Sequence, residues 1–406
     1  MALSKKEQRH AFIVIAILYG VWHTTSEWSK LLLPFIQWDA TPIITTFQLG
    51  VLNTVGNAFV LIGTFIFGHL LDTIGIKVAA VLATFFTGIF YMVCSQAHTY
   101  LAFLIFTPLR TVFQLPQICE SFIASVTDEN ERMRVIMRLG VPLGAAIVAG
   151  PWLGAKMIEV FDLREAHMVA GIVEIVICLP LILLALPEPH LAARRPRMIR
   201  LSDYNELIRL PSLRTTLFLR FLLDGPYQAY DILSRQYIIT QYLMEATDLA
   251  YLFVVIGATT VLANTVLIRW LQKCFQPRQL LQLALVFLAV SYYLIGIANH
   301  FHHMLFLMPL QVVGMSIAYA ELSAQITKNV ERQNYGKAIG LSQATQLLAA
   351  TLTPIIGGYF VSEYDFATWC NIAAVVSVVS VGILHFIGGY MNIAAPRLPT
   401  NDYRSE

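Results

Sequence analysis

The stretch GHLLDTIGIK, residues 68–77, places an aspartate and a lysine between two long apolar segments. The chain has 406 residues, of which 57% are hydrophobic and only 13% are charged, whereas soluble domains carry about 25% charged residues. Its mean hydropathy is +0.65. A helix needs roughly 20 apolar residues to cross a bilayer, and runs of that length recur throughout the sequence. The sequence therefore predicts a membrane protein with many spans, in which residues 68–77 form a loop at the membrane surface.

The apolar runs predict an all-α membrane protein with twelve transmembrane helices. The expected spans are 11–36, 44–71, 78–95, 99–126, 135–161, 166–186, 212–240, 248–271, 279–298, 303–327, 336–361 and 367–391. A polar segment rich in Arg and Pro separates the first six from the last six, and two repeated halves are a common plan of secondary transporters. The domains that follow are a six-helix half at 1–187, a cytosolic linker at 188–211, a second half at 212–392 and a cytosolic tail at 393–406.

The distribution of Lys and Arg predicts the orientation. Cytosolic loops of membrane proteins carry an excess of these residues. Nearly all of those outside the expected spans fall on one side of the membrane, together with both termini, and Arg164 falls on the other side. We therefore expect a multi-pass protein with both termini in the cytosol, either in the plasma membrane or in the membrane of an internal organelle.

The sequence lacks the motifs that are typical of other functional classes. The five cysteines show no paired spacing, so we expect neither a disulfide framework nor a metal cage. No His-x-x-Glu-His or Gly-x-Ser-x-Gly motif occurs, and an enzyme within the membrane would need such a cluster of catalytic or metal-binding residues. The basic residues are spread over many loops, which argues against a nucleic-acid surface. We expect no enzyme activity, no metal and no cofactor.

Span 7 carries five polar side chains on one helical face. Arg220, Asp224, Gln228, Asp231 and Arg235 follow one another at steps of four, four, three and four residues, which is the spacing of one face. A charge at mid-helix costs roughly 2.5–3.5 kcal/mol on insertion scales, so such residues tend to face a cavity. The alternative is that Arg220 with Asp224, and Asp231 with Arg235, form pairs that only neutralise one another within the helix.

Spans 1, 4, 10 and 11 add further polar faces. His23, Glu27 and Lys30 share one face of span 1, which matches span 7 by its position in the other half. The remaining candidates are Arg110, Gln114, Gln117 and Glu120 in span 4, Glu321 and Gln325 in span 10, and Gln343 and Gln346 in span 11. Together with span 7, these residues predict a cavity that binds a substrate and protons.

The opening stretch resembles the loop between spans 2 and 3 of the major facilitator superfamily. That loop has the pattern Gly-x-x-x-Asp-x-x-Gly-x-Lys/Arg, and Gly68, Asp72, Gly75 and Lys77 all fit it. The resemblance implies that the aspartate lies near the start of span 11 and helps to hold the two halves together on the cytosolic side. A carboxylate is favoured at a helix N-terminus, so we expect the four residues to act as a conformational latch.

Two further features resemble the drug/proton antiporter branch of that superfamily. Gly150, Pro151 and Gly154 in GPWLG resemble part of its span 5 motif, although Ala155 stands where a second glycine is usual. Arg110 resembles the arginine in span 4 of the same branch. The chain as a whole is similar to the tetracycline-efflux-like group. This resemblance implies transport coupled to protons.

These features predict a secondary active transporter of a small organic solute, with efflux of an organic cation or drug by proton antiport through alternating access. A carboxyl group in a partly dry cavity can hold a proton near neutral pH, and a bound cation would expel that proton. The candidate proton carriers are Glu27, Asp224, Asp231 and Glu321. Glu120 ranks after these four, and we favour Glu27 and Glu321. The proton gradient is then the coupling source, and the partners are the solute, protons and the lipid bilayer.

Two other functions are compatible with the sequence. Lys30, Arg110, Arg220 and Arg235 suit a uniporter, or a proton/anion symporter of an organic anion or amphiphile. A receptor or scaffold that no longer transports is the second, although such a protein would be expected to lose the charges in its spans. The substrate, the coupling ion, the direction of transport and the oligomeric state stay open.

Overall fold

The computed structural model describes residues 5–127, 135, 138–187, 207–328, 330 and 335–387. Within these residues the chain is built of helices and short connections, and it contains no strand. The expected all-α fold is therefore confirmed. Most of the expected linker at 188–211 and the whole tail at 393–406 lie outside the described residues.

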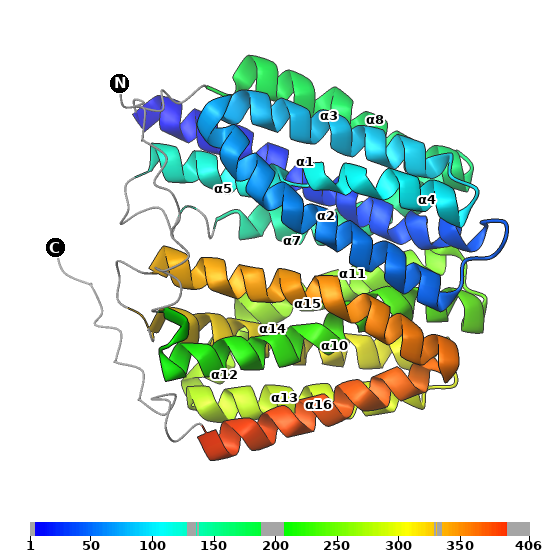
Figure 1. Cartoon of the computed structure of the whole chain (residues 1–406), viewed down its shortest axis with the longest axis vertical. Coiled ribbons are helices and arrows are strands. Elements are labelled where there is room, and N and C mark those ends of the chain that lie inside the picture. Colours follow the sequence, from blue (N-terminus) through cyan, green and yellow to red (C-terminus); the bar gives the residue numbers. More distant parts are fainter. Residues whose placement is uncertain are drawn as a thin grey trace. The chain divides into compact units, whose positions relative to one another are not determined.

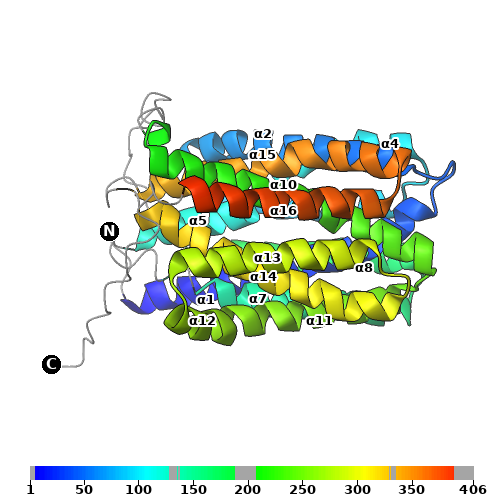
Figure 2. The same ribbon diagram turned by 90° about the horizontal axis from the view of Figure 1, so that it is seen from below.

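The helices follow the order of the expected spans, and Figures 1 and 2 show them from two directions. The segments before the linker are α1 (Lys5–Trp38), α2 (Thr46–Thr73), α3 (Ile76–Ser95), α4 (Tyr100–Phe106), η1 (Thr107–Val112), α5 (Leu115–Val126), α7 (Gly140–Ile158), α8 (Leu163–Pro180) and η2 (Leu181–Ala185). Those after it are α10 (Pro211–Tyr242), α11 (Ala246–Leu262), η3 (Ala263–Leu267), α12 (Ile268–Cys274), α13 (Pro277–Gly296), α14 (Phe301–Lys328), α15 (Tyr335–Glu363) and α16 (Phe366–Ile387). η1 is a 3-10 helix, and η2 and η3 are short π-helices.

These helices account for the twelve expected spans. In the part of the chain that is described, ten helical segments are long and apolar enough to cross a membrane. Three of the ten run through more than one element, namely α4 to α5, α8 with η2, and α11 to α12. α1 and α10 supply the other two spans, with 34 and 32 residues. Both helices are less apolar than the rest, because they carry the charged faces noted above.

Polar side chains fix where two of the spans begin. Before α2, the hydroxyl of Thr45 accepts a hydrogen bond from the backbone N–H of Gln48, and the side chain of Gln48 accepts one from the N–H of Thr45. Before α16, Asp365 accepts from the N–H of Thr368 at 2.6 Å. The hydrogen bonds from the side chain and backbone of Thr368 hold the pKa of the Asp365 carboxyl below its usual range. Such caps satisfy backbone donors that the first turn leaves free.

Span 4 is not one continuous helix. α4 passes into η1, which ends at Val112, and α5 begins only at Leu115. Phe113 leaves the helical region, with φ −72° and ψ 53°. Pro116 has no N–H to donate to the carbonyl of Val112, so an α-helix cannot continue through this point without losing a hydrogen bond. The expected single helix at 99–126 is therefore interrupted near its middle.

Contacts between Cα atoms divide the chain into two compact units. Unit 1 consists of Met1–Met198, Asp231–Ala258 and Thr351–Glu363, and unit 2 consists of Ile199–Tyr230, Thr259–Ala350 and Tyr364–Glu406. The C-terminal parts of α10 and α15 and most of α11 thus group with the first six spans. The domain boundaries at 187 and 212 stay a prediction.

Each unit has its own apolar core. In unit 1, α1 packs against α7 and α8, and α3 packs against α8 (Figure 1). Ala11, Leu18 and Ala79 are fully buried there. In unit 2, α13 packs against α14 and α16 (Figure 2), and Leu280 and Ala284 are fully buried. Small residues at these contacts let the helices approach closely, as is usual in membranes.

The opening stretch contains a tight turn between α2 and α3. α2 ends at Thr73 and α3 begins at Ile76. Gly75, between them, has φ 87° and ψ 166°, a region that residues with a side chain rarely adopt. The expected loop at 68–77 is thus mostly helical, because only residues 74 and 75 lie between α2 and α3. The backbone of this turn explains why the second glycine of the pattern is a glycine.

Replacement of Gly75 by alanine is expected to destabilise the protein. The backbone conformation at this position costs a residue with a Cβ about 1–3 kcal/mol, so Gly75→Ala should lower the melting temperature of the purified protein in detergent. Gly68→Ala in α2 is the matched control, because a Cβ at Gly68 meets open space. Equal melting temperatures of the two variants would show that the turn tolerates a side chain.

Candidate functional site

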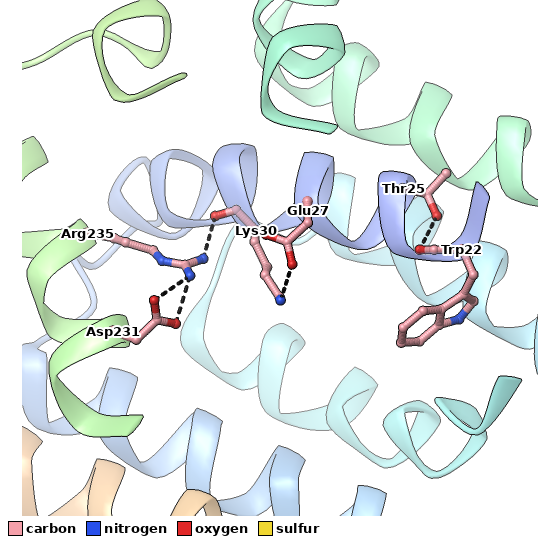
Figure 3. Close-up of polar contacts among 6 residues, drawn as sticks. All are labelled: Trp22, Thr25, Glu27, Lys30, Asp231 and Arg235. Atoms are coloured by element: carbon pink, nitrogen blue, oxygen red, sulfur yellow. Dashed lines mark hydrogen bonds and ion pairs between the residues drawn. The ribbon is translucent and has the colours of Figure 1, made fainter. Parts of the chain in front are cut away.

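Two ion pairs lie near each other in unit 1, one on α1 and one on α10 (Figure 3). On α1, Lys30 Nζ lies 2.5 Å from Glu27 Oε1. On α10, the guanidinium of Arg235 donates to both carboxylate oxygens of Asp231, at 2.8 and 2.7 Å. Arg235 also donates to the backbone carbonyl of Lys30 at 3.2 Å, and its guanidinium lies 5.0 Å from the ring of Phe253 in α11. It therefore ties α10 directly to α1.

Both pairs are accessible. The side chains of Lys30 and Glu27 are 48% and 18% exposed, and those of Arg235 and Asp231 are 12% and 39% exposed. An accessible ion pair contributes little to stability, so these pairs are not what holds the helices together. Their charges are within reach of a proton or a charged solute, which can compete for either partner.

The span 5 motif positions the acidic face of α1. A Cβ at Gly150 would lie 2.6 Å from the carbonyl oxygen of Thr24 and 2.7 Å from Glu27 Cβ, and one at Gly154 would lie 2.9 Å from a tryptophan ring of α1. These separations are too short for real contacts, so only glycine allows α7 to approach α1 this closely. Pro151 is buried in the same contact region of α7. The motif therefore acts here through helix packing beside Glu27.

Arg110 lies against α2 and not against an acid. Its Nη2 donates to Asn57 Oδ1 at 3.0 Å, and its guanidinium fills the space beside Gly56, where a Cβ would collide with it. The ring of Phe113 lies 5.9 Å from its Cζ. None of the ion pairs among the described residues includes Arg110. Its positive charge is therefore available to attract a negative group.

The glutamines of span 4 form hydrogen bonds with α2 near the break in that span. Gln114 is 3% exposed, and its Nε2 donates to the backbone carbonyl of Val60 in α2 at 2.8 Å. Thr64 donates to Gln114 Oε1 at 3.4 Å. Gln117 donates to the carbonyl of Thr64 at 3.5 Å, while its own Oε1 is buried without a hydrogen-bond partner. Gln114 thus fastens the interrupted span to α2, whereas Gln117 keeps an unused acceptor.

Aromatic rings and an acid lie together at the contact of α1 with span 4. The ring of His23 lies 4.4 Å from Tyr19 and 4.8 Å from Trp22, and Trp22 lies 6.2 Å from Phe113. His23 Nε2 is buried without a hydrogen-bond partner. Glu120 of α5 is half-buried and within electrostatic range of Tyr19, and it forms no ion pair with any described residue. Aromatic faces beside an unpaired carboxylate favour a cation.

The polar residues shared by α10 and α14 in unit 2 form a separate, buried group. Arg220 Nε lies 2.8 Å from Asp224 Oδ2, and the two side chains are 4% and 0% exposed. The guanidinium of Arg220 lies 3.5 Å from the ring centre of Tyr319 and donates to Ser323 at 3.2 Å. Asp224 Oδ1 is buried without a hydrogen-bond partner. Arg220 therefore joins α10 to α14.

The other expected residues of unit 2 differ in their environments. Glu321 is 1% exposed and accepts a hydrogen bond from Gln272 at 2.8 Å. Gln325 is 3% exposed, and its Oε1 has no hydrogen-bond partner. The remaining three are Gln228, which is half-buried, Gln343, which is exposed, and Gln346, which contacts Tyr319.

Both pairs that the sequence left as an alternative for span 7 are formed. The pair of Arg220 and Asp224 is buried in unit 2, and the pair of Asp231 and Arg235 is accessible in unit 1. Only the second pair has the accessibility that a binding site requires. The single polar face expected for span 7 is thus divided into a structural part and a candidate functional part.

The latch residues are described only in part. Gly75 forms the turn, Lys77 is half-buried in the first turn of α3, and Gly68 lies in α2. The side chain of Asp72 lies outside the described residues. The latch therefore stays a prediction.

The sequence marks Glu174 in span 6 as a buried, partnered polar group, but it does not show its partner or the contacts of His167 between α8, α1 and α3. Glu174 is 0% exposed, and its Oε2 lies 2.7 Å from Thr25 Oγ1. His167 is also fully buried, with Nδ1 3.0 Å from the Tyr91 carbonyl oxygen and Nε2 2.9 Å from Ser29 Oγ. The signal was present, because a histidine and a glutamate seven residues apart share one face of an otherwise apolar span.

The two pairs of α10 are expected to differ in their effect on stability. Removing one partner of a buried pair costs about 3–5 kcal/mol, because the other charge stays buried, whereas an accessible pair contributes about 0–1 kcal/mol. Asp224→Asn should therefore lower the melting temperature in detergent much more than Asp231→Asn, which changes a pair of the same type and spacing on the same helix. Similar shifts for both variants would contradict the buried, structural role of Arg220 and Asp224.

Comparisons with known proteins agree on the type of protein. A family model described as the Major Facilitator Superfamily matches residues 11–234 and 216–401. The mouse protein solute carrier family 22 member 18 is 21% identical over 370 residues, which cover 86% of this chain and 91% of that protein.

Solved structures give the same result for the fold. A bacterial homologue of the human lysosomal transporter Spinster matches with a TM-score of 0.76 at 12% sequence identity, over 98% of this chain and 100% of that one. The human organic anion transporter MFSD10 matches with a TM-score of 0.67 at 15% identity, over 93% and 99% of the two chains. The matching family model shows that the chain belongs to the major facilitator superfamily, and its apolar helices agree with this. The protein is therefore a multi-pass membrane transporter of solutes.

Proposed function

We propose that this transporter moves a small organic cation or drug out of the cytosol in exchange for protons, by alternating access. Membership of the superfamily supports the transport of a solute. The observation that carries the finer proposal is the accessible pair of Glu27 and Lys30 within the span formed by α1. The sequence resemblance to drug/proton antiporters supports it as well.

Glu27 can exchange between three positively charged partners, which are Lys30, a proton and a solute cation. In its ionised form it is held by Lys30 at 2.5 Å. Because Lys30 is itself half exposed, its amino group can turn towards water when another cation arrives. A bound cation favours the ionised carboxylate and releases a proton, whereas protonation weakens the binding of the cation. Competition for one carboxylate couples the two movements in opposite directions.

Tyr19, which lies within electrostatic range of Glu120, and the rings near it support the proposed class of substrate. Tyr19 and Trp22 both pack against the ring of His23, and Trp22 also packs edge-on against Phe113. A cation over an aromatic ring gains about 0.5–2 kcal/mol, and more where water is excluded. Glu120 adds a negative charge that no basic side chain neutralises among the described ion pairs. An organic cation with apolar groups matches this combination better than a small inorganic ion.

Transport of an organic anion is the second candidate function. It is favoured by Arg110, whose charge is not matched by an acid in the described ion pairs, and by the exposed amino group of Lys30. One protein of similar fold is described as an organic anion transporter. In this case the two basic groups would bind the solute.

Uptake into sealed vesicles that contain the purified protein tests the two candidates. A pH gradient is imposed while the membrane potential is clamped, and labelled tetraethylammonium and labelled p-aminohippurate are compared as the cation and the anion. Tetraethylammonium uptake is expected to follow the gradient. Glu27→Gln should lose this response, because a neutral amide does not take up a proton.

A matched control is available on α7. Lys156 and Glu159 form an ion pair of the same spacing as Glu27 and Lys30, with 2.6 Å between Nζ and Oε1 and both side chains exposed. Glu159→Gln should therefore keep the response to the gradient. If wild-type uptake ignores the gradient, or if only p-aminohippurate moves, cation antiport is wrong and the anion candidate takes its place.

A further inference from the structure

Glu174 in α8 is a carboxyl group that the proposed solute site does not use. It is 0% exposed, with Oε2 2.7 Å from the hydroxyl oxygen of Thr25 in α1 and Oε1 without a hydrogen-bond partner. Glu27, Asp224 and Asp231 each have a basic side chain beside them. Glu174 has none among the described ion pairs, so no positive charge among them stabilises its ionised form.

The hydrogen bonds of Thr25 cannot satisfy an ionised Glu174 completely. A hydroxyl has one hydrogen to donate, and the Thr25 oxygen lies 3.0 Å from the carbonyl oxygen of Trp22, as Figure 3 shows, and 3.2 Å from that of Val21. Carbonyl oxygens only accept. The hydroxyl can donate to only one acceptor among these two carbonyls and Glu174 Oε2, which lies 2.7 Å away. If it donates to Glu174, Oε1 is still left without a donor, and if it donates to its own helix, it has to accept a hydrogen bond from Glu174. Only a protonated carboxyl can donate that bond.

The groups that face Glu174 favour the same state. Tyr91 from α3, Cys119 from α5 and Cys178 from α8 interact with it electrostatically, and α1 presents the hydroxyl of Thr25. Tyrosine and cysteine are ordinarily neutral at pH 7, so none of these groups supplies a positive charge. A buried carboxylate without such a charge carries a large desolvation cost, which one hydroxyl does not offset.

The neighbouring histidine is not an equivalent proton site. The Tyr91 carbonyl accepts from His167 Nδ1 at 3.0 Å, so Nδ1 carries a hydrogen. Nε2 lies 2.9 Å from Ser29 Oγ and can accept from that hydroxyl. Both ring nitrogens are thus satisfied in the neutral form, whereas an ionised Glu174 would keep a buried oxygen, Oε1, without a donor.

Glu174 is connected to the proposed solute site through α1. Thr25 meets α8, while Glu27, two residues later, lies beside Gly150 of α7 and pairs with Lys30. α1 is helical throughout this stretch. A movement of α1 that follows a change at Glu27 therefore also moves Thr25 relative to Glu174.

We propose that Glu174 is a proton-binding site of this transporter, occupied while Thr25 packs against it and emptied when α1 moves away. On release, the carboxyl O–H bond breaks, the proton passes to water and a carboxylate is left. The part of Glu174 in coupling rests on the proton antiport of the proposed function, but its occupancy by a proton does not.

Infrared spectroscopy of the purified full-length protein tests the occupancy. A protonated carboxyl has a C=O stretching band separate from those of carboxylates, and wild type at neutral pH is expected to show one that Glu174→Gln lacks. The glutamine can donate to Thr25 in place of the protonated acid, so this variant should keep the wild-type melting temperature. Glu159→Gln, which removes an exposed acid, should keep the band.

A second variant covers the case in which Glu174→Gln does not fold. Thr25→Val removes the acceptor and leaves the carboxyl, so the band should stay but shift in frequency because its hydrogen bond is lost. A spectrum of protonated carboxyls that neither variant changes would overturn the proposal.

Transport in vesicles tests the role in coupling. Glu174→Gln should still exchange labelled for unlabelled tetraethylammonium across the membrane, but it should lose uptake driven by the pH gradient. If the infrared band is lost and gradient-driven uptake is unchanged, the coupling role is wrong. If wild type itself shows no gradient-driven uptake, the proposed function fails, and the infrared comparison still decides whether Glu174 holds a proton.

Discussion

A polar group within a membrane span is costly unless it finds a partner in the protein or faces a water-filled cavity, because the hydrocarbon core offers no water. An unmatched group there costs several kcal/mol. The described residues meet this constraint in three ways. Arg220 and Asp224 neutralise each other along one helix, Gln114 donates to a backbone carbonyl of α2 beside the break in span 4, and Glu174 is most easily accommodated as a neutral acid.

α1 is the helix on which the proposed solute site and the proposed proton site meet. Its contact with α7 requires Gly150, and its contact with α8 includes Thr25 and Glu174. Glu27 and Lys30 form an accessible pair on the same helix. Because a helix transmits displacement along its length better than a loop, a change at one face reaches the others. The proposed solute site and the proposed proton site can therefore be coupled without touching.

The comparisons establish the family, and the chain's own residues carry the argument about substrate. One fold supports the transport of many solutes, so likeness of fold does not select among them. The choice between cation and anion depends here on which charges lack a partner. Glu120 and Arg110 are the two such groups within span 4 as far as the described ion pairs show. Glu120 favours a cationic solute and Arg110 favours an anionic one. The aromatic rings of α1 favour the cation.

Local composition was enough to predict the membrane class, the twelve spans in order and the turn at Gly75, because hydropathy and backbone conformation depend on a few neighbouring residues. The same local spacing suggested that Arg220 would pair with Asp224. Contacts across helices could not be read in this way. Arg235 bonds to the backbone of Lys30, 205 residues away, and the carboxyl of Glu174 meets a hydroxyl 149 residues earlier in the chain. Those partners are chosen by how the helices pack, and packing depends on the shape of whole helix faces instead of on any short stretch of sequence.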